Sequence, residues 1–258
     1  MDRTNHLRRT LEAGESAYGA QAATFSPAVV EVYGSLGLDW VWVDLEHAGP
    51  SPWDGQWLSD LTRAADVADI ELLVRLPGGD PKLIRKALDA GVRTLLIPRV
   101  ESAAEVREAV AATRFRYDGG PGDRGVARGR VTEWGRDTDG YVEEEDANVT
   151  LGVMIENAAA VESLDDILAV PDLGFVFVGP ADLSVSLGRP LEKGHPDVRG
   201  HVDRIERAAL DAGVPLAGIA SSAEAVRDAE DRGYQLLRIG GDISSAQSVL
   251  GERLDAVR

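Results

Sequence analysis

The sequence predicts a single-domain α/β fold, a (β/α)8 TIM barrel with an N-terminal helix. Its 258 residues match the usual length of one such barrel. Short apolar runs alternate with segments of helical periodicity, as in a parallel sheet with crossover helices. Several of these runs end directly at a charged residue, as expected where parallel strands deliver functional side chains to one face.

The expected elements begin with a helix over residues 3–13. Eight candidate strands follow, at 17–24, 40–44, 71–75, 93–98, 149–155, 174–178, 215–219 and 235–240. They are rich in Val and Leu without strict alternation, which suits a sheet buried on both faces. Helical periodicity is clearest at 81–90, 103–113, 198–212 and 223–232. Glycines suited to end helices stand at Gly37, Gly91, Gly213 and Gly233. Eight such repeats favour a closed barrel over an open sheet.

Two segments depart from this rhythm. Residues 116–140 are rich in glycine and arginine, have no clear period, and are too long for a simple connector. We expect a functional loop there, either over the site or at a subunit contact. Residues 242–258 predict a final amphipathic helix. No shift in composition divides the chain, so residues 1–258 are expected to form one domain.

Composition limits the function classes. The formal charge of −17 argues against non-specific nucleic-acid binding. Without cysteine there is no disulfide, thiolate metal site or cysteine nucleophile. We expect a soluble cytoplasmic protein without a leader, because residues 1–6 lack the apolar h-region of a signal peptide and no run approaches the roughly 18 residues of a membrane span. Lysine occurs only at Lys82, Lys86 and Lys193. An acidic chain so poor in lysine favours a halophilic origin over an ordinary acidic protein of a mesophile.

Two carboxylates follow apolar strands. Glu156 comes directly after residues 149–155, and Asp182 lies shortly after 174–178. A pair of oxygen donors at strand ends suits a hard divalent cation such as Mg²⁺ or Mn²⁺. Taken singly, a surface ion pair explains Glu156 and a helix N-cap explains Asp182 about equally well. Both together favour the metal site.

A histidine and an arginine stand at two other strand ends. His47 follows Asp44 by three residues, and a histidine oriented by a carboxylate can act as acid or base near neutral pH. Glu46 could turn outward or brace the loop. Arg75 ends an apolar run and must find an anion or a carbonyl. A substrate keto oxygen is the favoured partner, and an acid such as Glu46 is the alternative.

A turn precedes the next expected helix at Gly179-Pro180-Ala181-Asp182-Leu183-Ser184. The backbone N–H groups of Ala181 and Asp182 could hold a substrate carboxylate.

Taken in order, these motifs resemble the HpcH/HpaI aldolase family, from about residue 14 to the C-terminus. The motifs are Val43-Asp44-Leu45-Glu46-His47-Ala48, Val74-Arg75-Leu76-Pro77, Met154-Ile155-Glu156 and Val178-Gly179-Pro180-Ala181-Asp182-Leu183-Ser184. The resemblance implies a class II pyruvate aldolase that requires a divalent cation (Mg²⁺, Mn²⁺ or Co²⁺). It also implies a homo-oligomer, a hexamer or trimer, with the C-terminal helix exchanged between subunits.

The resemblance also implies residue roles. Glu156 and Asp182 would ligate the metal, Arg75 would contact the keto oxygen, and His47 with Asp44 would form an acid/base dyad. The amides of Ala181 and Asp182 would hold the pyruvate carboxylate, and Ile219 would supply apolar contact.

The chain departs from the family pattern at two positions near the substrate. Met154 stands where several members have glutamine, and Gln21 where some have tryptophan near the end of the first strand. These departures leave the acceptor aldehyde open. The preferred metal and the direction of reaction are open as well.

Rival interpretations remain at this point. A Schiff-base aldolase needs a lysine at a strand end, and none of the lysines has that position. An acyl-CoA lyase of the citrate or malyl-CoA type would use the same acids, with Arg124, Arg128 and Arg130 available for CoA. A catalytically inactive barrel that binds a ligand is the second alternative. The expected partners are pyruvate and an aldehyde, without nucleic acid or membrane.

Overall fold

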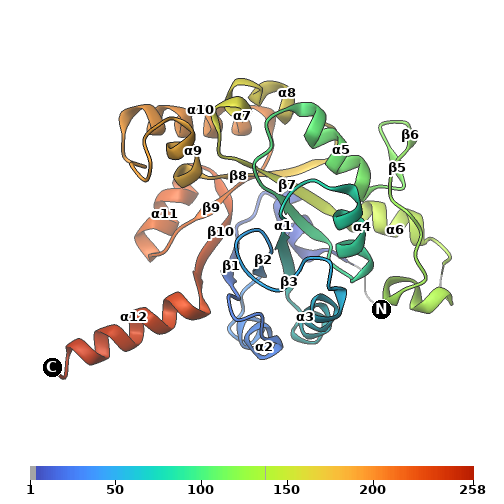
Figure 1. Ribbon diagram of the computed structural model, residues 1–258, viewed down its shortest axis with the longest axis horizontal. Coiled ribbons are helices and arrows are strands. Elements are labelled where there is room, and N and C mark those ends of the chain that lie inside the picture. The colour runs from blue at the N-terminus through green and yellow to red at the C-terminus, as the bar shows by residue number, and fades with distance from the viewer. Residues whose placement is uncertain (1–3, 137) are drawn as a thin grey trace.

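The computed structural model describes residues 4–136 and 138–258 and contains a closed barrel of eight parallel strands (Figure 1). The strands are β1 (Ala17–Gln21), β2 (Trp40–Asp44), β3 (Glu71–Arg75), β4 (Thr94–Ile97), β7 (Thr150–Ile155), β8 (Leu173–Val178), β9 (Leu216–Ile219) and β10 (Tyr234–Gly241). They close in chain order, with β10 beside β1. All eight predicted strands are confirmed, although β1 ends three residues before the predicted limit at 24.

Helices surround the barrel. They are α1 (His6–Glu12), α2 (Pro27–Ser35), α3 (Gly55–Ala68), α4 (Pro81–Asp89), α5 (Ala103–Thr113), α6 (Tyr141–Asn148), α7 (Ala158–Glu162), α8 (Leu164–Leu168), α9 (Pro180–Ser186), α10 (Pro196–Ala212), α11 (Ala223–Asp231) and α12 (Asp242–Asp255). Their starts follow capping chemistry, since the side chains of Asp80, Ser102 and Ser222 accept N–H bonds from the first turns. The predicted helix-stop glycines all have positive φ, at Gly37, Gly91, Gly213 and Gly233.

The barrel interior is filled by one cluster of apolar side chains, separate from the larger cluster between sheet and helices. Its largest members are Trp40, Trp42, Phe175 and Phe177. Close packing depends on small neighbours: a Cβ on Gly152 would lie 2.3 Å from Cε2 of Phe175. The interior is therefore a packed core, and open space can exist only at its ends.

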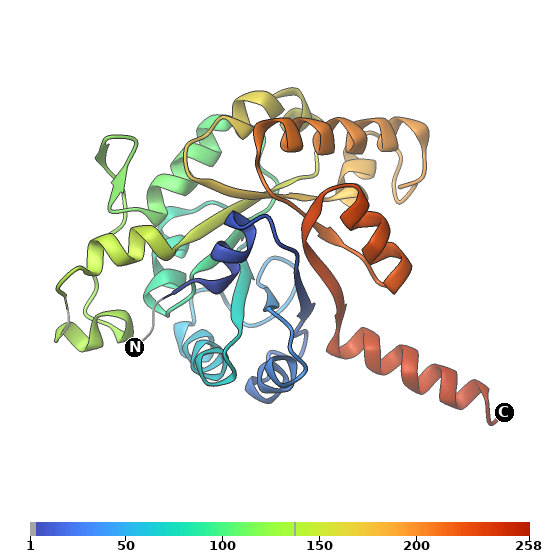
Figure 2. The ribbon, with the colours of Figure 1, turned by 180° about the vertical axis from the view of Figure 1, so that it is seen from behind.

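Helix α1 closes one end of the barrel. Leu7 and Leu11 belong to the interior cluster and are 1% and 6% exposed. Figure 2 shows this helix lying across the barrel, at the end where the strands begin. The predicted helix over 3–13 is confirmed over His6–Glu12, whereas residues 1–3 lie outside the described residues.

The segment 116–140 lies at that same end. It contains a short hairpin, β5 (Arg116–Tyr117) and β6 (Gly120–Pro121), and a 3₁₀ helix, η1 (Arg130–Gly135); residue 137 is not described. The Arg130 side chain pairs with Asp66 and donates to Thr62 at 3.3 Å. Both partners stand in the second half of α3, whose C-terminal end returns to the strand starts. The expectation of a loop over the site is therefore wrong, and a subunit contact stays a prediction.

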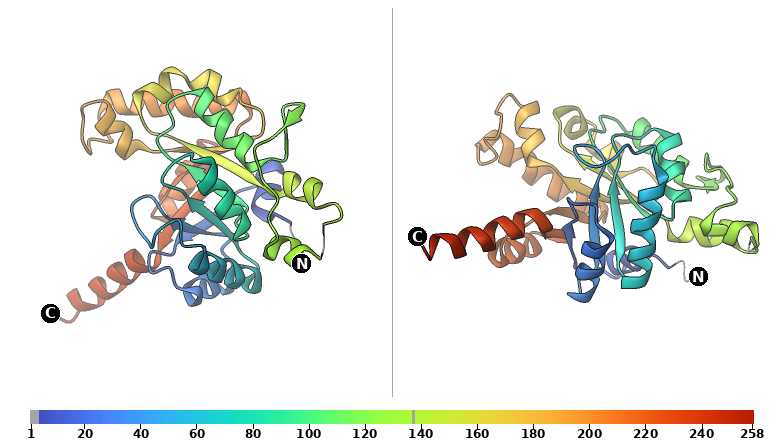
Figure 3. Two further views of the ribbon diagram at one scale, coloured as in Figure 1. Left: turned by 45° about the vertical axis from the view of Figure 1, so that its right-hand side comes forward. Right: turned by 60° about the horizontal axis from the view of Figure 1, so that its bottom comes forward.

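Helix α12 extends away from the barrel (Figures 1 and 3). It begins at Asp242 directly after β10, which confirms the predicted final helix as far as Asp255. The helix and the residues after it expose a row of apolar side chains, namely Ile243, Val249, Leu250, Leu254 and Val257. No helix among residues 4–136 and 138–258 is long and apolar enough to cross a membrane.

Candidate active site

The predicted site residues gather at the end of the barrel opposite α1. Asp44 and Arg75 are the last residues of β2 and β3 and are register partners. Glu156 follows β7 directly, and Asp182 lies in the first turn of α9, just after β8. Because parallel strands end on one face, this topology brings residues far apart in sequence together at one end of the barrel, the mouth.

Arg75 is held by two acids. Its Nε and Nη2 donate to the two carboxylate oxygens of Asp44 at 3.0 and 2.6 Å, and Nη1 lies 2.8 Å from Oε2 of Glu46. The guanidinium carbon lies 5.3 Å from the ring centroid of Trp42. Contact with Glu46, the alternative that sequence left open, is therefore present, and the planar fork is fixed in one orientation.

The pKa values of the two acids, Asp44 and Glu46, shift in opposite directions. Burial would raise the pKa of Asp44, but the hydrogen bonds and charge of Arg75 outweigh it and hold the pKa below its ordinary value. The pKa of Glu46 is raised, because its burial outweighs the charges of Arg75 and His47. Asp44 is therefore the more firmly ionised partner of Arg75.

His47 is placed differently from the expected dyad. Its side chain is 66% exposed, and its Nε2 lies 3.5 Å from Oε2 of Glu46. Asp44 instead accepts the backbone N–H groups of Glu46 at 3.0 Å and of His47 at 3.4 Å. Asp44 therefore fixes the loop that carries His47, and Glu46 is the carboxylate beside the imidazole.

Glu156 has a carboxylate oxygen without a partner. The residue is 3% exposed; its Oε1 accepts the Arg99 backbone N–H at 2.8 Å, while Oε2 is buried with no hydrogen bond in the described chain. Burial raises the pKa of Glu156 to about 7, the charges of Asp182 and Glu46 add to that rise, and the Arg99 N–H opposes it. A buried, unpartnered oxygen of this kind calls for a cation.

Local backbone geometry supports this carboxylate. Arg99 has φ +56°, a left-handed conformation uncommon for a non-glycine residue, and its N–H points at Glu156. Gly179 leaves room on the other side, since a Cβ there would lie 2.7 Å from the Cβ of Glu156. The loops after β4 and β8 thus both border the Glu156 side chain.

Asp182 completes a pair of oxygen donors. It is half-buried in the first turn of α9, and its charge raises the pKa of both Glu156 and Glu46. Among the described residues no three acidic or histidine side chains come close enough to form a larger ligand set. Glu156 and Asp182 suit a hard divalent cation that takes its other oxygen ligands from substrate or water.

The other predicted positions also face the mouth. Ile219 ends β9 and is 56% exposed, Gln21 ends β1, and Met154 lies on β7 with its Sδ 3.7 Å from Nη1 of Arg75. Ala181 stands beside Asp182 in α9. The structure therefore brings every predicted site residue to one end of the barrel.

Sequence reasoning missed one cation in this mouth. Arg238 on β10 places its guanidinium carbon 5.5 Å from the Trp42 ring centroid, and its Nη1 donates to Oε1 of Gln21 at 2.6 Å. A signal existed, because Arg238 interrupts the run Leu236-Leu237-Arg238-Ile239 as Arg75 ends its own apolar run.

Two of the three arginines considered for CoA, Arg124 and Arg130, do not line the mouth. Arg124 is buried against Glu145, and its guanidinium carbon lies 4.9 Å from the Phe115 ring centroid. Arg130 pairs with Asp66 at the opposite end of the barrel. The observation that kept an acyl-CoA lyase open therefore does not hold for these two residues.

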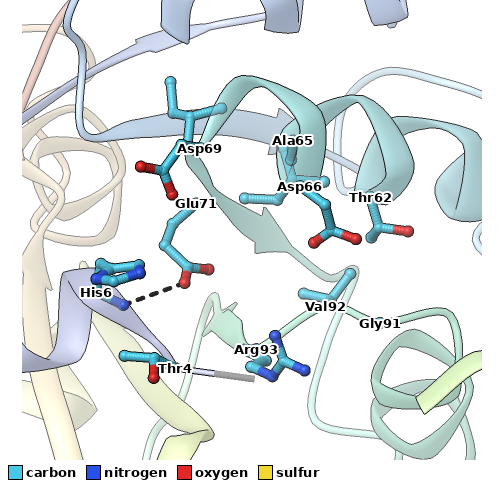
Figure 4. A pocket seen from close by; sticks show the side chains of 12 residues that line it. Thr4, His6, Thr62, Ala65, Asp66, Asp69, Glu71, Gly91, Val92 and Arg93 are labelled. Atoms are coloured by element: carbon cyan, nitrogen blue, oxygen red, sulfur yellow. Dashed lines mark hydrogen bonds between the residues drawn. The ribbon is translucent and has the colours of Figure 1, made fainter. Parts of the chain in front are cut away.

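A cavity of about 170 Å³ lies at the end where the strands begin (Figure 4). It is lined by residues near the starts of β3 and β4, among them His6, Asp66, Glu71 and Arg93. His6 donates its backbone N–H to Glu71 at 3.2 Å. No predicted catalytic or metal residue lines this cavity, so it is separate from the mouth.

Comparisons with known proteins agree with the site. The family model for HpcH/HpaI aldolase/citrate lyase matches residues 19–248. A hydroxypyruvate/pyruvate aldolase of Paraburkholderia phytofirmans is 33% identical over 259 residues, covering 99% of this chain and 98% of the relative. A 2-keto-3-deoxy-L-rhamnonate aldolase of Klebsiella pneumoniae is 34% identical and covers 97% of this chain and 92% of its own.

Solved structures extend the likeness to three dimensions. An HpcH/HpaI aldolase/citrate lyase family protein from Burkholderia cenocepacia superposes with a TM-score of 0.91 at 35% identity, covering 99% of this chain and 100% of that one. A citrate lyase from Burkholderia xenovorans reaches 0.61 at 15% identity, covering 87% and 72%, and that likeness extends to the fold alone.

Proposed function

We propose that this chain, which belongs to the HpcH/HpaI aldolase/citrate lyase family and is a class II aldolase, cleaves 4-hydroxy-2-oxo acids into pyruvate and an aldehyde or forms them from these two compounds. The observation that carries this proposal is the buried, unpartnered Oε2 of Glu156 near the charge of Asp182. A cation bound to this oxygen would offset the charges of both acids, and the charge of Arg75 also acts on Glu156, so a keto group bound to that cation would lie near a fixed guanidinium.

Glu156 and Asp182 would hold the divalent cation, with Mg²⁺, Mn²⁺ and Co²⁺ as the candidates. When bound, the cation supplies Lewis acidity that polarises the keto group of the 2-oxo acid. The two acids would bind and orient it, with Glu156 itself held between Gly179 and the Arg99 backbone.

Arg75 would contact the keto oxygen and stabilise the negative charge that develops on it when the methyl group loses a proton. Its support is the rigid fork, held by Asp44 and Glu46 and stacked on Trp42. The first backbone N–H groups of α9, at Ala181 and Asp182, would hold the carboxylate of pyruvate. Together these donors would fix the pyruvate half in one orientation.

His47 would exchange a proton with the hydroxyl group of the aldehyde half. Its exposed ring stands at the rim, where Glu46 can orient it while Asp44 fixes its backbone. Ile219 would give the aldehyde an apolar contact, and Gln21 and Met154 would border the same space. This arrangement keeps Asp44 in the catalytic group as the residue that positions both Arg75 and the loop.

The test is metal-dependent exchange of pyruvate methyl protons with deuterium, followed by NMR. Wild-type protein should exchange them with Mg²⁺, Mn²⁺ or Co²⁺, and lose the activity in EDTA. Glu156→Gln should slow exchange at least about a hundredfold, which corresponds to roughly 2.7 kcal/mol, whereas the exposed Glu162→Gln on α7 should not. Exchange in a metal-free preparation would refute the proposal. Little exchange would point to a CoA lyase, and none to a binding protein.

We further propose a cytoplasmic homo-oligomer, a hexamer or trimer, in which α12 packs on a neighbouring copy. Support comes from the exposed row of apolar side chains on a helix that leaves its own barrel. Light scattering should give a mass of three or six chains, and Leu250→Glu should lower it while Arg253→Glu should not. A monomeric mass for wild-type protein would contradict this arrangement.

A further inference from the structure

Arg238 is a second guanidinium in the mouth that the proposed chemistry does not use. Strand register pairs it with Ile219 on β9 and with Gly19 on β1, so it stands between two predicted substrate-facing strands. Its guanidinium lies against Trp42, the same indole that Arg75 contacts. Arg238 therefore points into the barrel near the level at which Arg75 binds its acids.

The guanidinium of Arg238 makes no direct ion pair with the residues that the structure describes. Across residues 4–136 and 138–258 no acidic side chain lies within 4.0 Å of its guanidinium, in contrast to Arg75 with two. Within this described part of the chain, its guanidinium has one hydrogen bond, to the neutral amide oxygen of Gln21. Burial lowers the pKa of Arg238, the neighbouring Arg75 lowers it further, and only Asp44 opposes them.

A half-buried cation next to another cation is costly unless an anion joins it. In the proposed function the carboxylate of pyruvate is already held by the α9 amides, and its keto oxygen by Arg75. An anion that binds Arg238 must therefore come from the aldehyde half of the substrate.

We propose that Arg238 is a specificity-determining residue that binds the carboxylate of an acidic acceptor aldehyde; this rests on the proposed function. Two N–H groups on one edge of a guanidinium match a carboxylate, and Gln21 restrains the other edge. Gln21, which stands where some family members have tryptophan, would then serve to orient Arg238 through its amide oxygen. The apolar Ile219 beside it favours a short chain between aldehyde and carboxylate.

The test compares two aldehydes of similar size, glyoxylate with its carboxylate and glycolaldehyde without it. Wild-type protein should add pyruvate to glyoxylate with the higher kcat/KM. Arg238→Met should lower the glyoxylate-to-glycolaldehyde ratio at least tenfold, and Arg238→Lys, which keeps the charge, should lower it less. Arg227→Met, which removes an exposed arginine from α11, should leave the ratio unchanged.

Three results would overturn the inference: a wild-type protein without preference for glyoxylate, a ratio in Arg238→Met within twofold of wild type, or a stronger Arg238-dependent preference for glyceraldehyde 3-phosphate over glyceraldehyde. If Arg238→Met fails to fold, Arg238→Gln is held to the same tenfold criterion. Exchange of pyruvate methyl protons needs no aldehyde. Wild-type protein that exchanges them but fails the ratio test refutes this inference alone, and protein that does not exchange them refutes the proposed function.

Discussion

Replacing Glu156 by glutamine should stabilise the metal-free protein while abolishing its stabilisation by metal. The substitution keeps the shape of the side chain, and its amide can still accept the Arg99 N–H. It removes a negative charge that is buried near Asp182 and Glu46 with one oxygen unpartnered. Without a cation that charge opposes folding.

The size and sign follow from the pKa of Glu156, which burial raises from 4.5 to about 7 in the folded protein. Between these values the folded state holds a proton that the unfolded state has released, so stability falls as pH rises through this window. Above pH 7 the full difference of roughly 3 kcal/mol opposes folding. Glu156→Gln should recover a sizeable part of it at pH 8 and little at pH 4.

Glu71 provides a matched control at the other end of the barrel. Burial raises its pKa from 4.5 to about 7 as well, but it lies in the cavity away from the mouth. Thermal melts at pH 4 and pH 8, with EDTA or with Mg²⁺, should show both Glu→Gln variants more stable than wild type at pH 8 in EDTA. Mg²⁺ should then stabilise wild type and Glu71→Gln, but not Glu156→Gln. Equal melting temperatures of wild type and Glu156→Gln at pH 8 in EDTA would refute the reasoning.

Three other predictions concern the fork, a glycine and the charge. Arg75→Lys keeps the charge but not the two-pronged bond, so kcat/KM should fall at least about tenfold, or roughly 1.4 kcal/mol; an effect no larger than that of the exposed Arg63→Lys would leave Arg75 a structural role only. Gly179→Ala should displace the Glu156 carboxylate, seen as weaker Mg²⁺ binding by calorimetry, and wild-type affinity would show that the loop yields. Because a charge of −17 repels itself, the melting temperature should rise between about 0.1 M and 2 M KCl, mostly below 1 M; a flat series would refute the halophilic assignment.

The strands were predictable because each apolar run is a local signal. The charged residues that follow those runs are also visible locally, and they predicted that the site lies at the end of the barrel where the strands end. The pairing of Asp44 was not predictable from its distance to His47, because the register of β2 and β3 sets it opposite Arg75 instead.

The position of residues 116–140 was also beyond local reasoning. Arg130 pairs with Asp66 on α3 and Arg124 with Glu145 on α6, and only the folded chain brings these partners together. Arg238 could have been found by the argument applied to Arg75, since both are cations bordered by apolar residues. Its lack of an acidic partner is visible only in three dimensions.

The seal that α1 makes with Leu7 and Leu11 has a consequence for the order of events in turnover. Because α1 closes one end of the barrel, reactants and products can enter and leave only through the mouth. Glu156 and Arg75 lie buried inside the mouth, whereas His47 and Ile219 are exposed at its rim. Pyruvate should therefore enter first and depart last, with the aldehyde coming and going behind it.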